Sequence, residues 1–271
     1  MKRQYFLLPI FLLVCILYGC KVDNTQKVYD TITVSKESHS FILLFADQGN
    51  YYSDDAQDTV FNKALAGTMS GVNSGKLEGM VLFPNNFFDT TLFTSTAQSF
   101  LHLFDKYGNN SFTGYPSVFE GMSNHKTNYN SWKFSIDSTQ KTSPVCGIGL
   151  VKQEFGSNIN IYAKVNFYDS VNDSINVAIY LVEKKVTGMQ RITPSDTSYT
   201  YIHQHVFSSE ANKSDFGSNI AASTYSGASY NLSGSFVLPP NSDKSNVEYL
   251  AVVYQYHNNQ PIKVLNCTSL K

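Results

Sequence analysis

Ser40-Phe-Ile-Leu-Leu-Phe-Ala46 is a continuous apolar run of strand length, and it decides how the first half of the chain is interpreted. A run without polar alternation is typical of a strand that is buried on both faces. The turn Asp47-Gln48-Gly49-Asn50 follows it. Ser53 is then a good N-cap, and the two acids after it suit the first turn of a helix. The segment therefore predicts a buried strand that leads into a helix.

The alternation of strand and helix continues from this point to about residue 119. Met80–Phe83 is a second short apolar run, and Thr94–Tyr107 has the spacing of an amphipathic helix. Gly114–Phe119 reads as a turn that feeds another strand. The order strand, helix, strand, helix, strand predicts an α/β layer.

From Cys146 onward the pattern changes to strands alone, separated by turns rich in Asn, Gly, Ser and Asp. Seven alternating segments with turn signals between them predict an antiparallel β-sandwich, similar to a jelly roll. The polar stretch Asp137–Pro144 marks the junction, so we expect one domain over 37–141 and a second over 142–271. The predicted strands are Val145–Glu154, Ile159–Tyr168, Ser174–Val182, Tyr199–Phe207, Tyr230–Leu238, Val247–Tyr256 and Pro261–Cys267.

The N-terminus has the anatomy of an export signal. Lys2 and Arg3 precede an apolar stretch, Tyr5–Tyr18, that is short for a membrane span. The ending Leu17-Tyr18-Gly19-Cys20 resembles the lipobox of bacterial lipoproteins. Residues 1–19 are therefore expected to be a signal peptide, with Cys20 carrying diacylglycerol and palmitate. The alternative is an ordinary signal peptide with a chance cysteine.

Residues 20–36 are expected to form a lipidated tether with one strand-like patch, Val28–Val34, where β-branched residues alternate. No later apolar run is long enough to cross a bilayer. The membrane is thus expected to be a partner through the N-terminal lipid alone.

Composition limits the class of partner and of chemistry. The formal net charge is −1, only 15% of residues are charged, and no basic stripe occurs, so nucleic acid is not expected as a ligand. Cys146 and Cys267 are the two cysteines beyond Cys20. In an oxidising compartment they can form a disulfide, or they can be buried free thiols that pack as small hydrophobes.

The first half resembles a thioredoxin-like domain. Its apolar strand runs into Ala46-Asp47 and a short loop before the helix, and Tyr115-Pro116-Ser117 stands where that fold keeps a cis-proline. The resemblance implies a cis peptide bond at Pro116 and a neighbouring groove that binds an extended peptide through main-chain hydrogen bonds.

Motifs in the second half resemble one lipoprotein family. The segments are Val177–Glu183, Gly188-x-Gln190 and Tyr201-Ile202-His203-Gln204-His205-Val206. They are similar to the outer membrane protein twenty-eight-related (Omp28-related) family of Bacteroidetes, whose members join a thioredoxin-like domain to a β-sandwich behind a lipoprotein signal. The resemblance implies a lipid-anchored protein of the cell outer membrane, facing the periplasm or the surface. One departure is that Ser208 and Ser209 stand where the family tends to have an arginine.

The redox centre of a thioredoxin is missing. Disulfide exchange needs a thiolate at the helix N-terminus, and no sulfur lies between Phe41 and Phe61. The sequence therefore predicts no enzyme and no cofactor. It predicts a non-catalytic binding or assembly module for a peptide, protein or glycan.

Two alternatives remain open. His203 and His205 share a face if they lie on one strand, so together they can bind a metal ion, with Glu183 or His257 as a further ligand. The same histidines can instead form hydrogen bonds with neighbouring strands. The second alternative is a purely structural component of the cell surface. The sequence does not indicate an oligomeric state.

Overall fold

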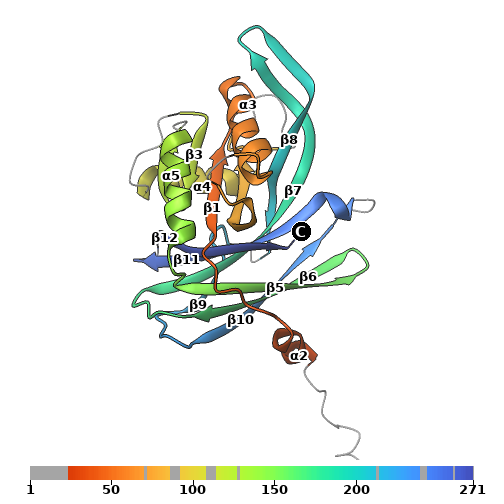
Figure 1. Cartoon of the computed structure of the whole chain (residues 1–271). Coiled ribbons are helices and arrows are strands. Elements are labelled where there is room, and N and C mark those ends of the chain that lie inside the picture. The colour runs from red at the N-terminus through yellow and green to blue at the C-terminus, as the bar shows by residue number, and fades with distance from the viewer. Residues whose placement is uncertain are drawn as a thin grey trace, which may run out of the picture.

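The computed structural model describes residues 24–69, 72–85, 92–107, 114–126, 129–211, 214–238, 243–258 and 260–270 (Figure 1). The expected signal peptide and Cys20 lie outside the described residues. Within the described part, no helix is both long enough and apolar enough to cross a membrane.

The apolar run is strand β1 (Ser40–Phe45), and it is buried on both faces, as predicted. It pairs in parallel with β2 (Leu77–Leu82) and antiparallel with β3 (Ser117–Glu120), which continues through a tight turn into β4 (Ser123–Lys126). Phe41, Leu43 and Phe45 point to one face, and the alternate side chains point to the other. Each face needs a cover, which explains why the run has no polar position.

Helices cover both faces of β1. On one face lies α4 (Ser95–Tyr107), with Phe100 and Phe104 against β1. On the other face lie α3 (Tyr52–Gln57), its π-helical continuation η1 (Asp58–Leu65), and α5 (Tyr129–Lys141). The predicted strand–helix alternation is confirmed, and the structure adds the helix α5, which the sequence analysis did not predict.

The second half is built from strands, and all seven predicted segments are confirmed. β7 and β8 extend furthest beyond the predicted bounds, because they form one long hairpin whose tip projects beside α3 (Figure 1). The strands are β5 (Cys146–Phe155), β6 (Asn158–Phe167), β7 (Ser174–Thr193), β8 (Asp196–Glu210), β9 (Ser218–Ala221), β10 (Ser229–Val237), β11 (Val247–His257) and β12 (Gln260–Leu270). Two short 3-10 turns, η2 (Ser74–Lys76) and η3 (Lys244–Asn246), precede β2 and β11.

The strands form two sheets that pack as a sandwich. One sheet has nine strands in the order β12-β11-β7-β8-β2-β1-β3-β4, with β9 beside β7, and the other has the order β10-β6-β5. Ile159, Ile161 and Val165 of the small sheet pack against Ile179 and Val253 of the large one. The large sheet contains strands from both halves of the chain, joined where Val81 of β2 pairs with Val206 of β8.

The lead segment differs from the prediction. Where a strand-like patch was expected at Val28–Val34, the chain forms helix α2 (Asn24–Asp30) and then runs extended without pairing. Its β-branched residues cross the outer face of β5 at Gly147 and Gly149. A Cβ atom on either glycine would overlap the carbonyl oxygens of Ser35 and Thr33. The extended conformation is therefore stabilised by packing onto a strand face and not by a sheet edge.

Candidate functional site

The loop after β1, where the resemblance places a redox centre, is filled by the chain's own amide groups. Gln190 of β7 is fully buried, and its Nε2 lies 3.0 Å from the Asn50 carbonyl and within 3.4 Å of two more loop carbonyls. Gln48 Nε2 donates in return to the Met189 carbonyl, 3.1 Å away. The β7–β8 hairpin is therefore fixed to this loop by hydrogen bonds in both directions.

The Tyr115–Pro116 peptide bond is cis. The carbonyl oxygen of Tyr115 accepts a hydrogen bond from Asn50 Nδ2 at 2.6 Å. A peptide docked beside a cis-proline needs such a carbonyl, and here the loop already uses it. The pKa of the Tyr115 phenol is raised, first by burial and then by Asp47. The carbonyl expected to bind a peptide is thus already bonded to Asn50, and the pocket of about 390 Å³ beside this loop is lined by Asn50 and not by Tyr115.

His203 and His205 both lie toward α3 and η1, but each has partners of its own. His203 is fully buried, with its ring nitrogens 3.3 Å from Gln57 Oε1 and 3.2 Å from the Met189 carbonyl. His205 stacks on Phe61 and lies 2.9 Å from Glu248 on β11. No three His, Cys, Asp or Glu side chains gather into a metal-binding group in the described part of the chain.

The two proposed metal partners lie apart from this pair. Glu183 on β7 is half-buried and stands opposite Val206, whereas His257 pairs with Asp173 at 2.8 Å. His205 has a φ of +49°, which is uncommon for a residue with a side chain. Its ring reaches across β7 to form this hydrogen bond with Glu248.

Cys146 and Cys267 are both buried, and both are free thiols. The disulfide alternative is therefore not the one that the structure adopts. Burial raises the pKa of both thiols, and for Cys267 the acids Glu78 and Glu120 add to the effect. Protonated, enclosed thiols are poor nucleophiles, so both pack as small hydrophobes, Cys146 in the core between the two sheets and Cys267 in the core that includes Phe100 of α4.

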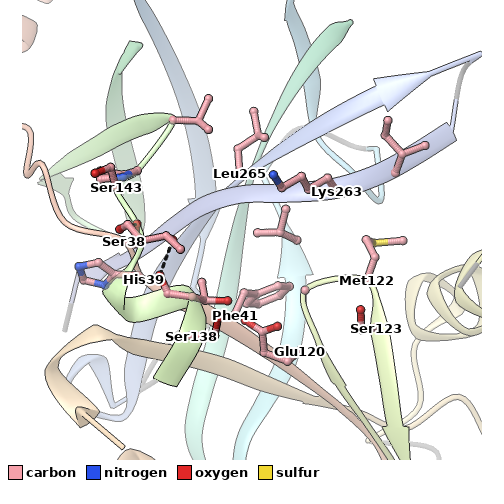
Figure 2. Close-up of a pocket in the computed structure, with 17 residues that line it drawn as sticks. Ser38, His39, Phe41, Glu120, Met122, Ser123, Ser138, Ser143, Lys263 and Leu265 are labelled. Carbon is pink, nitrogen blue, oxygen red and sulfur yellow. Dashed lines mark hydrogen bonds between the residues drawn. The ribbon is translucent and has the colours of Figure 1, made fainter. Parts of the chain in front are cut away.

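A pocket of about 430 Å³ opens where the two end strands of the nine-stranded sheet approach each other (Figure 2). The turn between β3 and β4 forms one wall, and Ile262–Leu265 of β12 forms the opposite wall. The two walls come together at Gly121, where a Cβ atom would lie 3.9 Å from the Val264 Cβ. The C-terminal end of α5 and the segment leading into β5 close the side.

The β12 wall is irregular at this place. Its pairing with β11 shifts register twice, which leaves Leu265 and Ile262 as extra residues, and Pro261 precedes them. Bulges and proline on an edge strand prevent pairing with another strand, and bulges often lie beside binding sites. The β12 edge at this place therefore does not present a regular ladder for pairing with an added β-strand.

Two opposite charges line the pocket. Glu120, at the end of β3, is only 8% exposed, and its Oε2 accepts a hydrogen bond from Ser135 Oγ at 2.8 Å. Lys263 lies on the β12 wall, across the pocket in Figure 2, and is exposed. Within the described part of the chain, neither Glu120 Oε1 nor the Lys263 ammonium has a hydrogen-bond or ion-pair partner.

Hydroxyl groups are the commonest polar groups in the remaining lining. Ser38 donates to the Thr142 carbonyl at 2.8 Å and so ties the lead segment to the end of α5 (Figure 2). Phe41, at the base, is 1% exposed, and the lining has no Tyr or Trp. The hydroxyl-bearing residues are Ser38, Ser123, Ser138, Thr139, Thr142 and Ser143.

Sequence reasoning did not single out Glu120 or Lys263. The one local signal was Glu120 itself, an acid at the end of the buried strand Ser117-Val118-Phe119. A carboxylate is seldom fully buried unless it has a partner. Lys263 gives no local signal, because only the curl of the sheet brings β12 to face β3.

Solved structures with the same fold share little sequence with this chain. HBP35 of Porphyromonas gingivalis matches with a TM-score of 0.66 and 12% identity, over 88% of this chain and 76% of that one. Protein AGR_C_4864 from Agrobacterium tumefaciens matches with a TM-score of 0.57 and 9% identity, over 87% and 96% of the two chains. No curated protein matches the chain closely enough to count as a relative.

A domain of the outer membrane lipoprotein Omp28 from Porphyromonas gingivalis aligns with 47% of this chain and 88% of its own length, at 15% identity and a TM-score of 0.33. The family model of outer membrane protein Omp28 matches residues 106–271, which is more than half of the sequence. That match covers every strand from β3 to β12 and includes both charged walls of the pocket. The chain therefore belongs to the Omp28 family of outer membrane proteins.

Proposed function

We propose that this protein is a non-catalytic, lipid-anchored binding module of the outer membrane, and that its ligand occupies the pocket between β3–β4 and β12. The observation that carries the proposal is the buried Glu120, which leaves one carboxylate oxygen open to a pocket whose opposite wall holds the unpaired Lys263. Burying a charge without a partner is costly, so such an arrangement is typical of a site with a polar ligand.

The non-catalytic part of the proposal rests on the loop after β1. We infer that residues 37–141 are a degenerate thioredoxin-like domain, which is supported by the order β2-β1-β3-β4, the helices on both faces and the cis bond before Pro116. The loop has no cysteine, and Gln190 and Asn50 occupy the carbonyls that a substrate would need.

A filled pocket tests the binding proposal. Ser138 is exposed on α5 and lines the pocket, so Ser138→Trp blocks it without disturbing the core. Lys133→Trp, on the same helix but outside the pocket, is the matched control. We would measure melting temperatures with saturating amino acids, short peptides, saccharides and polyamines.

A ligand at about one hundred times its Kd adds about 2.7 kcal/mol of stability and raises the Tm by about 5 °C or more. We expect one ligand class to do so with the wild type and Lys133→Trp but not with Ser138→Trp. If no class shifts the wild-type Tm, or if the tryptophan at 138 leaves the shift intact, the pocket is not the binding site.

The anchor proposal has a separate test. In Figure 1, α2, the first described element, lies at the opposite end of the molecule from the tip of the β7–β8 hairpin, so an anchor at Cys20 would place that tip far from the membrane. Two or three acyl chains, at roughly 0.8 kcal/mol per buried methylene, make such an anchor permanent. We expect the wild type to carry a diacylglycerol-sized mass increase and to fractionate with the outer membrane. Cys20→Ser should be released or left unprocessed, and equal fractionation of the two forms would refute the anchor.

A further inference from the structure

We propose that the ligand of this pocket is a small zwitterion with a free ammonium group and a free carboxylate, such as an amino acid or a dipeptide. The ammonium is bound by Glu120 and the carboxylate by Lys263. This inference rests on the proposed function, because it names the ligand class of the same site.

The acidic wall selects a cation. Glu120 is more than nine-tenths buried, and Ser135 engages only Oε2, so Oε1 is left to accept from a ligand. A carboxylate held in this way gains most from a donor that carries a positive charge, because charge-assisted hydrogen bonds are the strong ones. An ammonium group presents three such donors, and the open pocket side of Glu120 has room for one of them to reach Oε1.

The basic wall selects an anion. Lys263 forms no ion pair with the described residues, and its flexible stem starts from the irregular stretch of β12 between the two bulges. A lysine ammonium acts as a mobile point charge that can close over a carboxylate. Because Glu120 and Lys263 stand on opposite walls, one small molecule can meet both only if it carries both charges (Figure 2).

The rest of the lining excludes other ligand classes. Saccharides are usually held against an exposed aromatic face, and the two aromatic rings of the lining, Phe41 and His39, are only 1% and 12% exposed. A phosphate or another simple anion would meet the Glu120 carboxylate. The ring of hydroxyls suits the polar side chain of an amino acid, and about 430 Å³ is within the range of small-molecule sites.

Calorimetric titration of the purified full chain tests the ligand class. The probes are L-serine, L-glutamine and glycylglycine, each compared with its N-acetylated form and its C-terminal amide. We expect at least one free zwitterion to bind and both of its blocked forms to bind about tenfold more weakly or worse. Equal binding of the blocked forms would overturn the inference, whatever the variants do.

Two variants test whether Glu120 and Lys263 bind the charged groups of the ligand, and each variant has a matched control. Glu120→Gln keeps an acceptor for Ser135 and should weaken binding by about tenfold or more, as should Lys263→Met. Glu183→Gln and Lys164→Met, at half-buried positions outside the pocket, should bind as the wild type does.

The outcomes separate this inference from the proposed function. If no zwitterion binds but Ser138→Trp still removes the thermal shift caused by another ligand class, the pocket is a binding site and the zwitterion inference is wrong. If no ligand of any class depends on residue 138, both fail together.

Discussion

At the scale of single residues, the Gly188-x-Gln190 motif and His203 form one packed unit. A Cβ atom on Gly188 would lie 3.2 Å from the His203 ring, and His203 itself binds the Met189 carbonyl. Gln190, next along β7, turns inward to the loop after β1. The motif that pointed to the family thus holds the hairpin against that loop, and it does so through amide and imidazole hydrogen bonds.

Replacement of Gln190 by leucine should lower the free energy of unfolding by about 1–3 kcal/mol, because buried loop carbonyls lose their donor. Urea denaturation followed by fluorescence measures the change. Gln204→Leu is the control, since Gln204 is half-buried on β8 of the same hairpin and its side chain forms no hydrogen bond within the described residues. A loss below about 0.5 kcal/mol, within the range of ordinary surface substitutions, would show that the Gln190 hydrogen bonds do not stabilise this loop.

Because the phenols of Tyr180 and Tyr254 are buried, we expect the protein to lose stability at alkaline pH. They lie 3.1 Å apart in the core, and Tyr180 donates to the Asp215 carbonyl at 2.7 Å. Burial raises the pKa of both phenols. A group whose pKa is higher in the folded state stabilises the fold fully below its unfolded pKa. That contribution falls as pH rises past about 10 toward the folded value.

Tyr180→Phe should therefore cost about 1 kcal/mol at pH 7.5 and flatten the decline of stability between pH 9.5 and pH 11. Urea midpoints across this pH range measure both effects. Tyr225→Phe, at an exposed position, should change neither. An unchanged alkaline slope in Tyr180→Phe would show that another group causes the decline.

Candidate site residues could be predicted from the sequence only where a local sequence pattern indicated them. The missing thiol and the paired histidines were visible in the sequence, and Cys146 with Cys267 was left open between a bridge and free thiols. Glu120 and Lys263 were not found, because neither has a motif. They face each other only because the sheet brings its end strand β12 close to the turn between β3 and β4, at the other end of the strand order.

At the scale of elements, the lead segment is extended because it packs on β5, and β5 has glycines where the segment crosses it. Tyr29 of α2 packs edge-on against Tyr162 of β6 at 5.5 Å, and the chain beyond it crosses Gly147 and Gly149. Asn266 then ends the crossing, because its Nδ2 donates to the Glu37 carbonyl and its Oδ1 accepts from the His39 amide. The tether is thus bound to the sandwich for most of its described length.

Gly149→Val should displace this segment, because the side chain would occupy the place of the Thr33 carbonyl. We expect faster hydrogen exchange in residues 29–38 while the core strands stay protected. Mass spectrometry of peptides from exchanged protein measures this. The control is Gln153→Val, four residues further along the same face of β5. Equal exchange in the two variants would show that the glycine is not needed for the lead segment to bind.

The periodicity of the sequence predicted element type well and failed where packing decides the conformation. Period-2 alternation located strands such as β6 and β10, which bury one face, whereas β7 and β11 are buried on both faces over much of their length. Helix α5 was missed since only Trp132 and Ile136 of its described residues are buried, which is too few to stand out in a polar segment. Val28–Val34 has β-branched residues, yet part of it is helical. The rest is extended because it packs onto the face of β5 that carries Gly147 and Gly149.

At the scale of the whole molecule, the two halves share their cores. The cluster around Phe45 and Phe100 also contains Tyr180, Leu250 and Cys267 from the second half, and Val206 of β8 packs with the residues under α3. Sequence could not predict this, because alternation does not say which strands pair. The division at residues 141 and 142 remains a prediction about folding units, and the shared cores argue that the units are coupled.

We therefore expect one cooperative unfolding transition for the described body. In differential scanning calorimetry, the calorimetric and van't Hoff enthalpies should agree, as they do for a two-state unit. Phe45→Ala in the first half should cost about 3–5 kcal/mol, because Phe45 is fully buried and packs edge-on against the rings of Phe104 and Phe119. At about 2–4 °C per kcal/mol, the midpoint temperature of the whole transition should fall, and the protection of β11 in the second half against hydrogen exchange should fall with it.

Ser229→Ala, at an exposed position on β10, is the control for differences in expression and handling. If Phe45→Ala instead splits the endotherm and only one part moves, the halves unfold independently, and the shared sheet does not couple them.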